Sequence, residues 1–534
     1  MPHTSSSMPR SAALISLMAL ASRLLGLLRD MAMAWLLGGG PAAEALVIAM
    51  RVPHMIRRLF GEGSLSMTIT AALVRLGCAP SPSGSVSPAP DARRMAAMTS
   101  ALHWRLALAL GLPVALCCWQ AEACVALLAP AASAAVLDQA APLLRICLPY
   151  ALAASLAALG MALLHSLQRF FLPALAPVLF NCAVLAAAAL AACGGGDAAG
   201  LLAGGMLCGG IAQWASQRMG TIRLRRAASS APADGRTAWR LLGGLPAGAL
   251  GAAAPQLSML CATAAASALP GGTVAALYYA ERLLELPLGV LSMGLGIASL
   301  PVLSRLAAAG RHELLAGQTS DALRWSLLLT LPAAAGLAAV AAPLISLLLE
   351  HGAFAARDVR LATLALMGYL PALPACGLTR ILLAACHARG MGRPPLYGAL
   401  LATAASALAA GLCAATVHTE DALWALTLSC AAALWIQPLL LWRVLNRSLA
   451  AHHACLRLSR KALGQMAFAA LCTWLAAGSA AGLPCAAGWK LCLAVPAGIV
   501  CYAAVLMALR NADALDILRR LRLWWTQRHT SSLS

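Results

Sequence analysis

The feature that most constrains this chain is a long series of apolar segments. A bilayer-spanning helix needs about 20 apolar residues, and backbone groups in lipid must bond within their own segment. About fourteen segments meet this requirement roughly, and they lie near residues 11–37, 42–75, 102–129, 138–166, 172–193, 198–219, 240–268, 273–304, 322–349, 361–386, 395–416, 421–442, 462–482 and 489–509. The pattern predicts an all-α polytopic membrane protein with about 14 transmembrane helices.

The composition supports this fold class. Of the 534 residues, 61% are hydrophobic and only 10% are charged, whereas a soluble domain has about a quarter charged residues. The net charge of +20 would indicate nucleic-acid binding in a soluble protein. In a membrane protein, basic residues instead collect in cytoplasmic loops, so no nucleic-acid partner is expected.

Charge alternates between successive connections. The connections after every second segment hold most of the arginines outside the spans, whereas the opposite set contains only Arg357, Arg360 and Lys490. Because positive charge marks the cytoplasmic side, the asymmetry predicts an even number of spans with both termini in the cytoplasm. Arg23, Arg29 and Asp30 interrupt the first apolar run, which we interpret as a retained helix and not a signal peptide.

The cysteines suggest no metal site. Eighteen cysteines are scattered through apolar segments, and none has the spacing of a metal-ligand pair. We expect no metal, no cofactor and no catalytic residues. The basic tail after residue 510 contains two tryptophans near 524–525, and it could rest on the anionic membrane surface or be a solvated end.

A weak internal repeat divides the chain. The stretch 148–173 resembles 370–395, and in both an LP pair is followed at the same interval by His, then by Arg and Pro. The repeat predicts two six-helix lobes, 10–226 and 237–447. Two further helices would occupy 461–510, followed by a basic cytoplasmic tail, 511–534. Transporters are often built from such repeats, with the substrate held between them.

Ionisable residues cluster inside three predicted spans. A single Arg at mid-membrane costs ~2.5–3.5 kcal/mol, so these groups must be paired or line a wet cavity. The cluster comprises Arg23, Arg29, Asp30, Arg51, Arg57, Arg58, Glu62, Glu281, Arg282 and Glu285. It contains six arginines against four acids, an excess of two positive charges.

An excess of guanidinium groups suits a phosphate-bearing substrate, because the planar fork of Arg grips phosphate oxygens bidentately. The alternative is that some arginines extend to the lipid headgroups while others form structural ion pairs. The position of Arg282 between two carboxylates favours the functional interpretation. Pro53 is expected to kink the second helix beside the cluster. Six other polar residues are interpreted as structural: Arg145, His165, Asn181, Arg380, His387 and Gln437.

Several stretches resemble the MurJ/MviN family of lipid II flippases, members of the MOP exporter superfamily. They are SRLLGLLRD (22–30), RVPHMIRRLFGEGSLS (51–66), LQRFFLPALAPVLFN (167–181), LYYAERLLELPLGV (277–290) and LLLEHGAF (347–354) with the HARG–RPP turn (387–395). The resemblance implies a MATE-like transporter that moves undecaprenyl-pyrophosphate-linked disaccharide-pentapeptide, lipid II, across the bacterial inner membrane. It also implies that the last two helices form a groove for the polyprenyl tail.

The resemblance further implies which residues bind the substrate. These would be Arg23, Arg29, Asp30, Arg57, Glu62, Arg282 and Glu285, with weaker candidates at Glu44, Arg51, Arg58 and Glu281. The chain departs from the family pattern at four positions, since Glu44 and Glu281 replace Asp, Arg51 replaces Lys and His54 replaces Asn. Expected partners are lipid II, membrane lipids and cell-wall synthesis proteins.

Two other functions remain open. One is a different MOP transporter, either an oligosaccharide-lipid flippase or a cation-coupled drug exporter, although the basic excess opposes export of cationic drugs. The other is an enzyme such as a polyprenyl-phosphate glycosyltransferase. That chemistry uses carboxylate-rich sites at the membrane surface, and the connections here are poor in acids. We therefore expect a transporter and not an enzyme.

Overall fold

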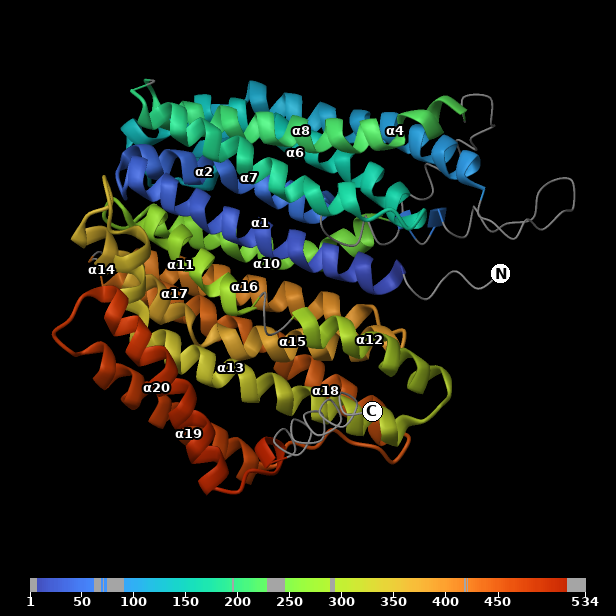
Figure 1. Ribbon diagram of the computed structural model, residues 1–534, viewed down its shortest axis with the longest axis vertical. Helices are drawn as coiled ribbons and strands as arrows, with labels where there is room; N and C mark the ends of the chain where they lie inside the picture. The colour runs from blue at the N-terminus through green and yellow to red at the C-terminus, as the bar shows by residue number, and fades with distance from the viewer. Residues whose placement is uncertain are drawn as a thin grey trace, which may run out of the picture. The chain divides into compact units, whose positions relative to one another are not determined.

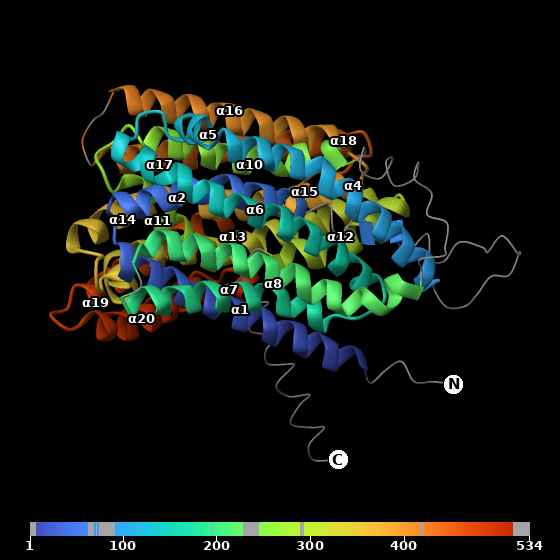
Figure 2. The same ribbon diagram turned by 90° about the horizontal axis from the view of Figure 1, so that it is seen from above.

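The computed structural model describes residues 7–61, 69–70, 72–73, 91–194, 196–227, 245–288, 293–416, 419 and 421–515. Within these ranges the chain is mostly helical, with turns and short connections between the helices, and contains no strand (Figures 1 and 2). The described part contains nine helices long and apolar enough to cross a membrane, or ten if one bent pair forms a single span. The predicted fold class, an all-α polytopic membrane protein, is confirmed.

The predicted second and eighth segments are each divided in the structure. The second consists of a 16-residue helix followed by the π-helical turn Arg57–Gly61. The eighth is divided into helices of 15 and 16 residues. Pro53 lies inside the helix that precedes the π-helical turn, so hydrogen bonding changes close to where the sequence predicted a kink.

The chain divides into two compact units. Unit 1 comprises Met1–Ala275 with His351–Ala355, and unit 2 comprises Ala276–Glu350 with Ala356–Ser534. The helices of unit 1 are α1 (Ser7–Leu37), α2 (Pro41–Ile56), η1 (Arg57–Gly61), α4 (Ala92–Trp119), α5 (Ala121–Leu128), α6 (Ala134–Ser166), α7 (Phe171–Ala192), α8 (Ala198–Ala227) and α10 (Leu245–Ala266).

The helices of unit 2 begin with α11, whose first turn belongs to unit 1. They are α11 (Thr273–Pro287), α12 (Met293–Ala308), α13 (His312–Leu349), α14 (Ala356–Tyr369), α15 (Ala372–Ala388), α16 (Arg393–Thr416), α17 (Ala422–Leu434), α18 (Ile436–Ala450), α19 (Arg460–Ala481) and α20 (Ala487–Ala508). The predicted lobes 10–226 and 237–447 are separated by 227–236, of which 228–236 lie outside the described residues, and the lobes stay a prediction.

Glycines allow the helices of unit 1 to approach closely. A Cβ added to Gly210 of α8 would lie 2.4 Å from Cδ2 of Tyr150 on α6. A Cβ on Gly209 would lie 3.0 Å from the carbonyl oxygen of Phe180 on α7. Membrane helices associate through such close packing of small residues, since lipid supplies no hydrophobic driving force between them.

The segment His351–Ala355 joins unit 1 through the turn after α1. The Ala353 N–H donates to the Trp35 carbonyl oxygen at 2.9 Å. Gly38 has φ +58°, and a Cβ there would lie 2.2 Å from the Ala353 carbonyl oxygen. Only glycine fits this left-handed turn, because any side chain would meet backbone.

The last two helices pack on α13 within unit 2. The Tyr502 hydroxyl of α20 donates to the Leu328 carbonyl oxygen of α13 at 3.0 Å. Leu327, Met466 and Leu506 form a buried core among α13, α19 and α20. The outer faces of α19 and α20 carry many exposed large apolar side chains, as expected of helices that face lipid.

Candidate anion-binding site

Arg29, a member of the predicted cluster in unit 1, makes three side-chain hydrogen bonds. Its Nε and Nη2 donate to Asp30 Oδ1 at 3.0 and 2.7 Å, and its Nη1 donates to Asn181 Oδ1 at 3.0 Å. Asn181, on α7, also donates from Nδ2 to the Ser22 carbonyl oxygen of α1 at 3.0 Å. One amide side chain therefore ties α7 to α1 and fixes the guanidinium.

The Arg29–Asp30 pair could not be read from helical spacing. Consecutive helical residues point about 100° apart, so the sequence placed Arg29 away from the face of Arg23 and Asp30. The long Arg side chain reaches back to its neighbour, and Asn181 holds it there. Asn181 lies close to Gly26, since a Cβ there would be 3.7 Å from Asn181 Nδ2, an ordinary van der Waals distance.

A row of aromatic side chains connects Arg29 to α2. The Arg29 guanidinium carbon lies 5.8 Å from the centroid of the Phe180 ring, which stacks on Tyr150 at 4.9 Å. Tyr150 in turn meets the His54 ring edge-on at 6.4 Å. A cation over an aromatic face is attracted by the ring quadrupole. The row therefore adds a second fixed contact for the guanidinium.

The other predicted basic residues of unit 1 lie on α1, α2 and η1. Arg51 is buried on α2, Arg57 and Arg58 are half-buried in η1, and Arg23 is exposed on α1. π-Helical turns occur often at functional sites because they shift side chains out of the regular register. Glu62, also predicted as a site residue, lies outside the described residues.

Glu44 makes a contact that differs in kind from those of the arginines. Its Oε1 accepts hydrogen bonds from the backbone N–H groups of Gly272 and Val274, at 2.9 and 3.1 Å. These N–H groups belong to the first turn of α11, where the helix dipole favours negative charge. This carboxylate caps a helix, and its role in substrate binding stays a prediction.

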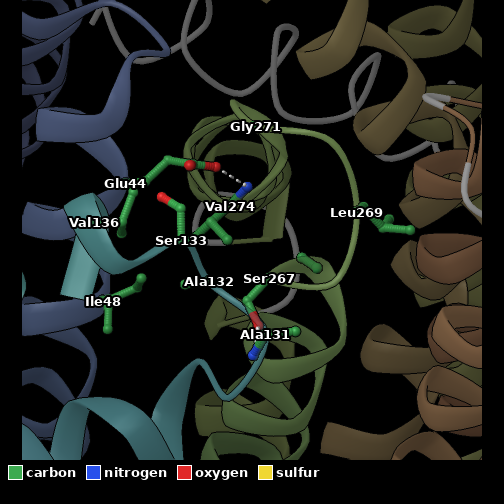
Figure 3. Close-up of a pocket in the computed structure, with 11 residues that line it drawn as sticks. Glu44, Ile48, Ala131, Ala132, Ser133, Val136, Ser267, Leu269, Gly271 and Val274 are labelled. Atoms are coloured by element: carbon green, nitrogen blue, oxygen red, sulfur yellow. Dashed lines mark hydrogen bonds between the residues drawn. The ribbon is translucent and has the colours of Figure 1, made fainter.

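A cavity of about 230 Å³ opens beside this cap (Figure 3). It is lined by residues of α2, the α5–α6 connection and the α10–α11 connection, including Ile48, Ser133, Ser267 and Val274. Among its described lining residues the one charged group is the Glu44 carboxylate. A negative lining disfavours an anion, so this cavity is not the predicted phosphate site.

Unit 2 contains a second cluster on α11, built around the single arginine Arg282. Arg282 Nη1 donates to Glu285 Oε2 at 2.8 Å, one helical turn away, and the guanidinium carbon lies 5.0 Å from the Tyr278 ring centroid. Glu281 is half-buried next to it. Arg29 and Arg282 are thus each held by a carboxylate and an aromatic face. Such contacts orient a guanidinium for bidentate contact with phosphate.

Several polar residues that were interpreted from the sequence as structural make contacts within the protein. Arg145 Nη2 pairs with Glu122 at 3.0 Å. Arg380 and Gln437 donate to the carbonyl oxygens of Leu288 and Pro395, both at 3.4 Å. Asn181 is also hydrogen-bonded, but the sequence interpretation missed that its partner is Arg29. The sequence signal that could have indicated this contact was the position of Asn181 as a single amide in an otherwise apolar segment.

No group of three or more His, Cys, Asp or Glu side chains with metal-binding geometry occurs among the described residues. The chemistry of the two clusters is therefore that of paired guanidinium and carboxylate groups inside apolar helices.

The fold defines a polytopic membrane protein, and its helices α1 and α11 carry the paired arginines Arg29 and Arg282. A sequence model described as "Lipid II flippase MurJ" matches residues 33–500, so this chain belongs to the MurJ family. This confirms the family resemblance found in the sequence.

Individual relatives support the same family assignment. A protein of Rhizobium meliloti named "Probable lipid II flippase MurJ" is 32% identical, covering 72% of this chain and 71% of that protein. A protein of Bdellovibrio bacteriovorus with the same name is 30% identical, covering 74% of each.

Solved structures support the fold. A lipid II flippase MurJ in an inward closed conformation superimposes with a TM-score of 0.76 at 20% identity, covering 94% of this chain and 99% of that one. An inward-facing MATE-family multidrug transporter of the MOP superfamily gives a TM-score of 0.64 at 15% identity, covering 80% of this chain and 95% of that one. The expected MATE-like architecture is confirmed at the level of fold.

Proposed function

We propose that this protein is a lipid II flippase. It moves the undecaprenyl-pyrophosphate-linked disaccharide-pentapeptide from the inner to the outer leaflet of the bacterial cytoplasmic membrane. Membership of the MurJ family supports the substrate, and likeness to MATE-family transporters supports movement by alternating access. The relatives' printed names refer to lipid II flipping, which supports a transporter.

The observation that carries the proposal is the fixed guanidinium of Arg29. Its side chain is 16% exposed, and its partner Asp30 is buried. An ionised group inside a membrane helix is costly. Because Asp30, Asn181 and Phe180 nevertheless hold the Arg29 guanidinium in place, we infer that it has a function. Phosphate recognition is the chemistry for which a fixed guanidinium fork is best suited.

In this mechanism the pyrophosphate is bound by arginines of the two predicted lobes. These are Arg23, Arg29 and Arg57 from the first lobe and Arg282 from the second, with Asp30, Glu62 and Glu285 orienting them. Four further residues contribute less to the electrostatic field of the substrate cavity: Glu44, Arg51, Arg58 and Glu281. The sugar-peptide head occupies a wet cavity, while α19 and α20 guide the polyprenyl tail along their apolar outer faces.

Alternating access requires that something favour one state over the other. The membrane potential supplies ~2.3 kcal/mol per charge per 100 mV, and the basic cluster provides charges on which it can act. Cell-wall synthesis proteins on either side of the membrane would supply lipid II and consume it. Both termini lie in the cytoplasm in this scheme.

The test is complementation in a bacterium depleted of its own flippase. Exposure of lipid II on the outer leaflet is measured with this chain, with Arg29→Ala and with Arg282→Ala. Arg223→Ala removes the same charge from an exposed position at the end of α8 and is the matched control. Wild type and the control should restore exposure, and the two site variants should lower it about 10-fold or more, as expected for lost charge-assisted contacts.

Two results would contradict the proposal. Full exposure by both site variants, in protein that is folded and inserted, would remove the arginines from the site. Export of cationic drugs by the wild-type chain, without restored lipid II exposure, would favour the alternative of a drug exporter of the same superfamily.

A further inference from the structure

A second basic cluster lies between α4 and α8 of unit 1, apart from the proposed transport site. Its α8 members are Trp214, Arg218 and Arg225, spaced by four and seven residues. At 100° per residue these positions fall within about 40° of one another. They therefore form a single stripe on α8, which packs against α4.

His103 of α4 faces this stripe. Its ring stacks on Trp214 with centroids 6.3 Å apart, and Arg225 and Arg218 both interact electrostatically with it. His103 is only 8% exposed. The cluster thus brings two arginines, an indole N–H and an imidazole to one place.

Several polar atoms of this cluster have no hydrogen-bond partner within the part of the chain that the structure describes. Among the described residues, no hydrogen-bond partner is found for the buried His103 Nδ1, Trp214 Nε1 and Arg225 Nε atoms. Arg225 is half-buried and Arg218 is exposed, and neither forms an ion pair with any carboxylate that the structure describes. Buried polar groups are rarely left unsatisfied, and an unmatched group often indicates a bound ligand or ion. The buried Arg225 Nε and Trp214 indole N–H, with the exposed charge of Arg218 on the same stripe, suit an anion.

The depth of the cluster indicates where that anion comes from. Helix α8 has 30 residues, or about 45 Å, against a hydrocarbon core of about 30 Å. All charged residues of α8 lie among its last ten residues, so we expect this end, with Arg218 and Arg225, to lie in the headgroup layer. Trp104, next to His103 on α4, is 73% exposed, and exposed tryptophans are typical of the membrane interface. The site opens to lipid at headgroup depth.

We propose that the α4–α8 cluster binds the phosphodiester of an anionic phospholipid headgroup. Arg218 and Arg225 form charge-assisted hydrogen bonds to the phosphate oxygens, and the Trp214 indole donates a further bond. Basic pockets between membrane helices on the cytoplasmic side are suited to such headgroups. The bound lipid would act as a fixed part of the surface of unit 1.

Native mass spectrometry of the purified full chain, titrated with phosphatidylglycerol or phosphatidylcholine, tests this proposal. Wild type should retain one phosphatidylglycerol in preference to phosphatidylcholine. The double variant Arg218→Gln/Arg225→Gln should weaken phosphatidylglycerol binding about 10-fold or more, since both charge-assisted contacts are lost. Trp214→Phe, which keeps the ring but removes the donor, should weaken it by a smaller factor.

Arg223→Gln is the matched control. Residue 223 lies nine positions after Trp214, about 180° away on the opposite face of α8, and its side chain is exposed. The Arg223→Gln substitution removes one positive charge from the same end of α8 and should leave phosphatidylglycerol binding within about twofold of wild type. Unchanged phosphatidylglycerol binding in the double variant, with a normal thermal midpoint, would overturn the site. Displacement of the lipid by millimolar inorganic phosphate or glycerol phosphate would overturn the lipid assignment.

Discussion

At the scale of single residues, this protein holds two arginines inside its helices, Arg29 and Arg282, each by more than one partner. Arg29 has a carboxylate, an amide and an aromatic face, and Arg282 has a carboxylate and an aromatic face. In a medium of low dielectric each contact is stronger than it would be in water. Orientation, as well as charge, is therefore expected to matter at these positions.

Arg29→Lys tests orientation, because it keeps the positive charge but loses the planar fork. Lysine cannot bond Asp30 and Asn181 in the same geometry and cannot hold a phosphate bidentately. Lipid II exposure should fall about 10-fold, a loss near 1.4 kcal/mol of transition-state stabilisation. The same change at Arg223 is the control and should have little effect. Equal activity of Arg29→Lys and wild type would show that charge alone suffices.

Glu44→Gln tests the cap on α11. The amide oxygen can still accept from Gly272 and Val274, but the charge that suits a helix N-terminus is lost. We expect destabilisation of about 1–2 kcal/mol, and more for Glu44→Ala, which leaves two buried donors unsatisfied. The thermal unfolding midpoint should be highest for wild type, lower for Glu44→Gln and lowest for Glu44→Ala.

The control for Glu44 is Glu122→Gln. Its side chain is 82% exposed and paired with Arg145, and exposed pairs contribute little to stability. A midpoint for Glu122→Gln lowered as much as that of Glu44→Gln would refute the capping role, since general loss of negative charge would then explain both.

At the scale of elements, unit 1 depends on close approach at the glycines of α8. Tyr150 and Phe180 belong to the aromatic row that ends at Arg29. Phe180 lies against Gly209, and Tyr150 lies against Gly210. Packing between α6, α7 and α8 is therefore coupled to the position of the Arg29 guanidinium. A change on α8 that never touches Arg29 should still affect transport.

Gly210→Ala tests this coupling. Its methyl group would lie 2.4 Å from Tyr150 Cδ2, so the ring or the helix must move, at a cost of about 1–3 kcal/mol. Both the thermal midpoint and lipid II exposure should fall. Gly204→Ala, on the same helix, is the control, because nothing lies within 4 Å of its added Cβ. Alanine is the better helix former by up to about 1 kcal/mol, so this variant should be neutral or stabilising.

At the scale of the whole molecule, the topology follows from the distribution of arginine between connections. The predicted cytoplasmic connection between α18 and α19 holds Arg457 and precedes Arg460 and Lys461, whereas the connection between α19 and α20, Gly482–Ala486, has no charge. The positive-inside rule therefore assigns these two connections to opposite sides.

Reporter fusions test this assignment. Green fluorescent protein fused after Ser534 should fluoresce, and alkaline phosphatase inserted at Pro484 should be active, because that enzyme matures only outside the cytoplasm. Phosphatase inserted at His453 is the control and should be inactive. The reverse pattern would place both termini outside and invert the proposed direction of transport.

The sequence by itself determined the all-α membrane fold, because span length and hydrophobicity are local properties of a segment. Sequence motifs also identified the family and the basic cluster. The tertiary structure alone revealed the partners of these charges. Asn181 is 152 residues from Arg29, and Gly272 is 228 residues from Glu44. Contacts over such separations depend on helix packing, which hydrophobic periodicity does not encode when helices are apolar on every face.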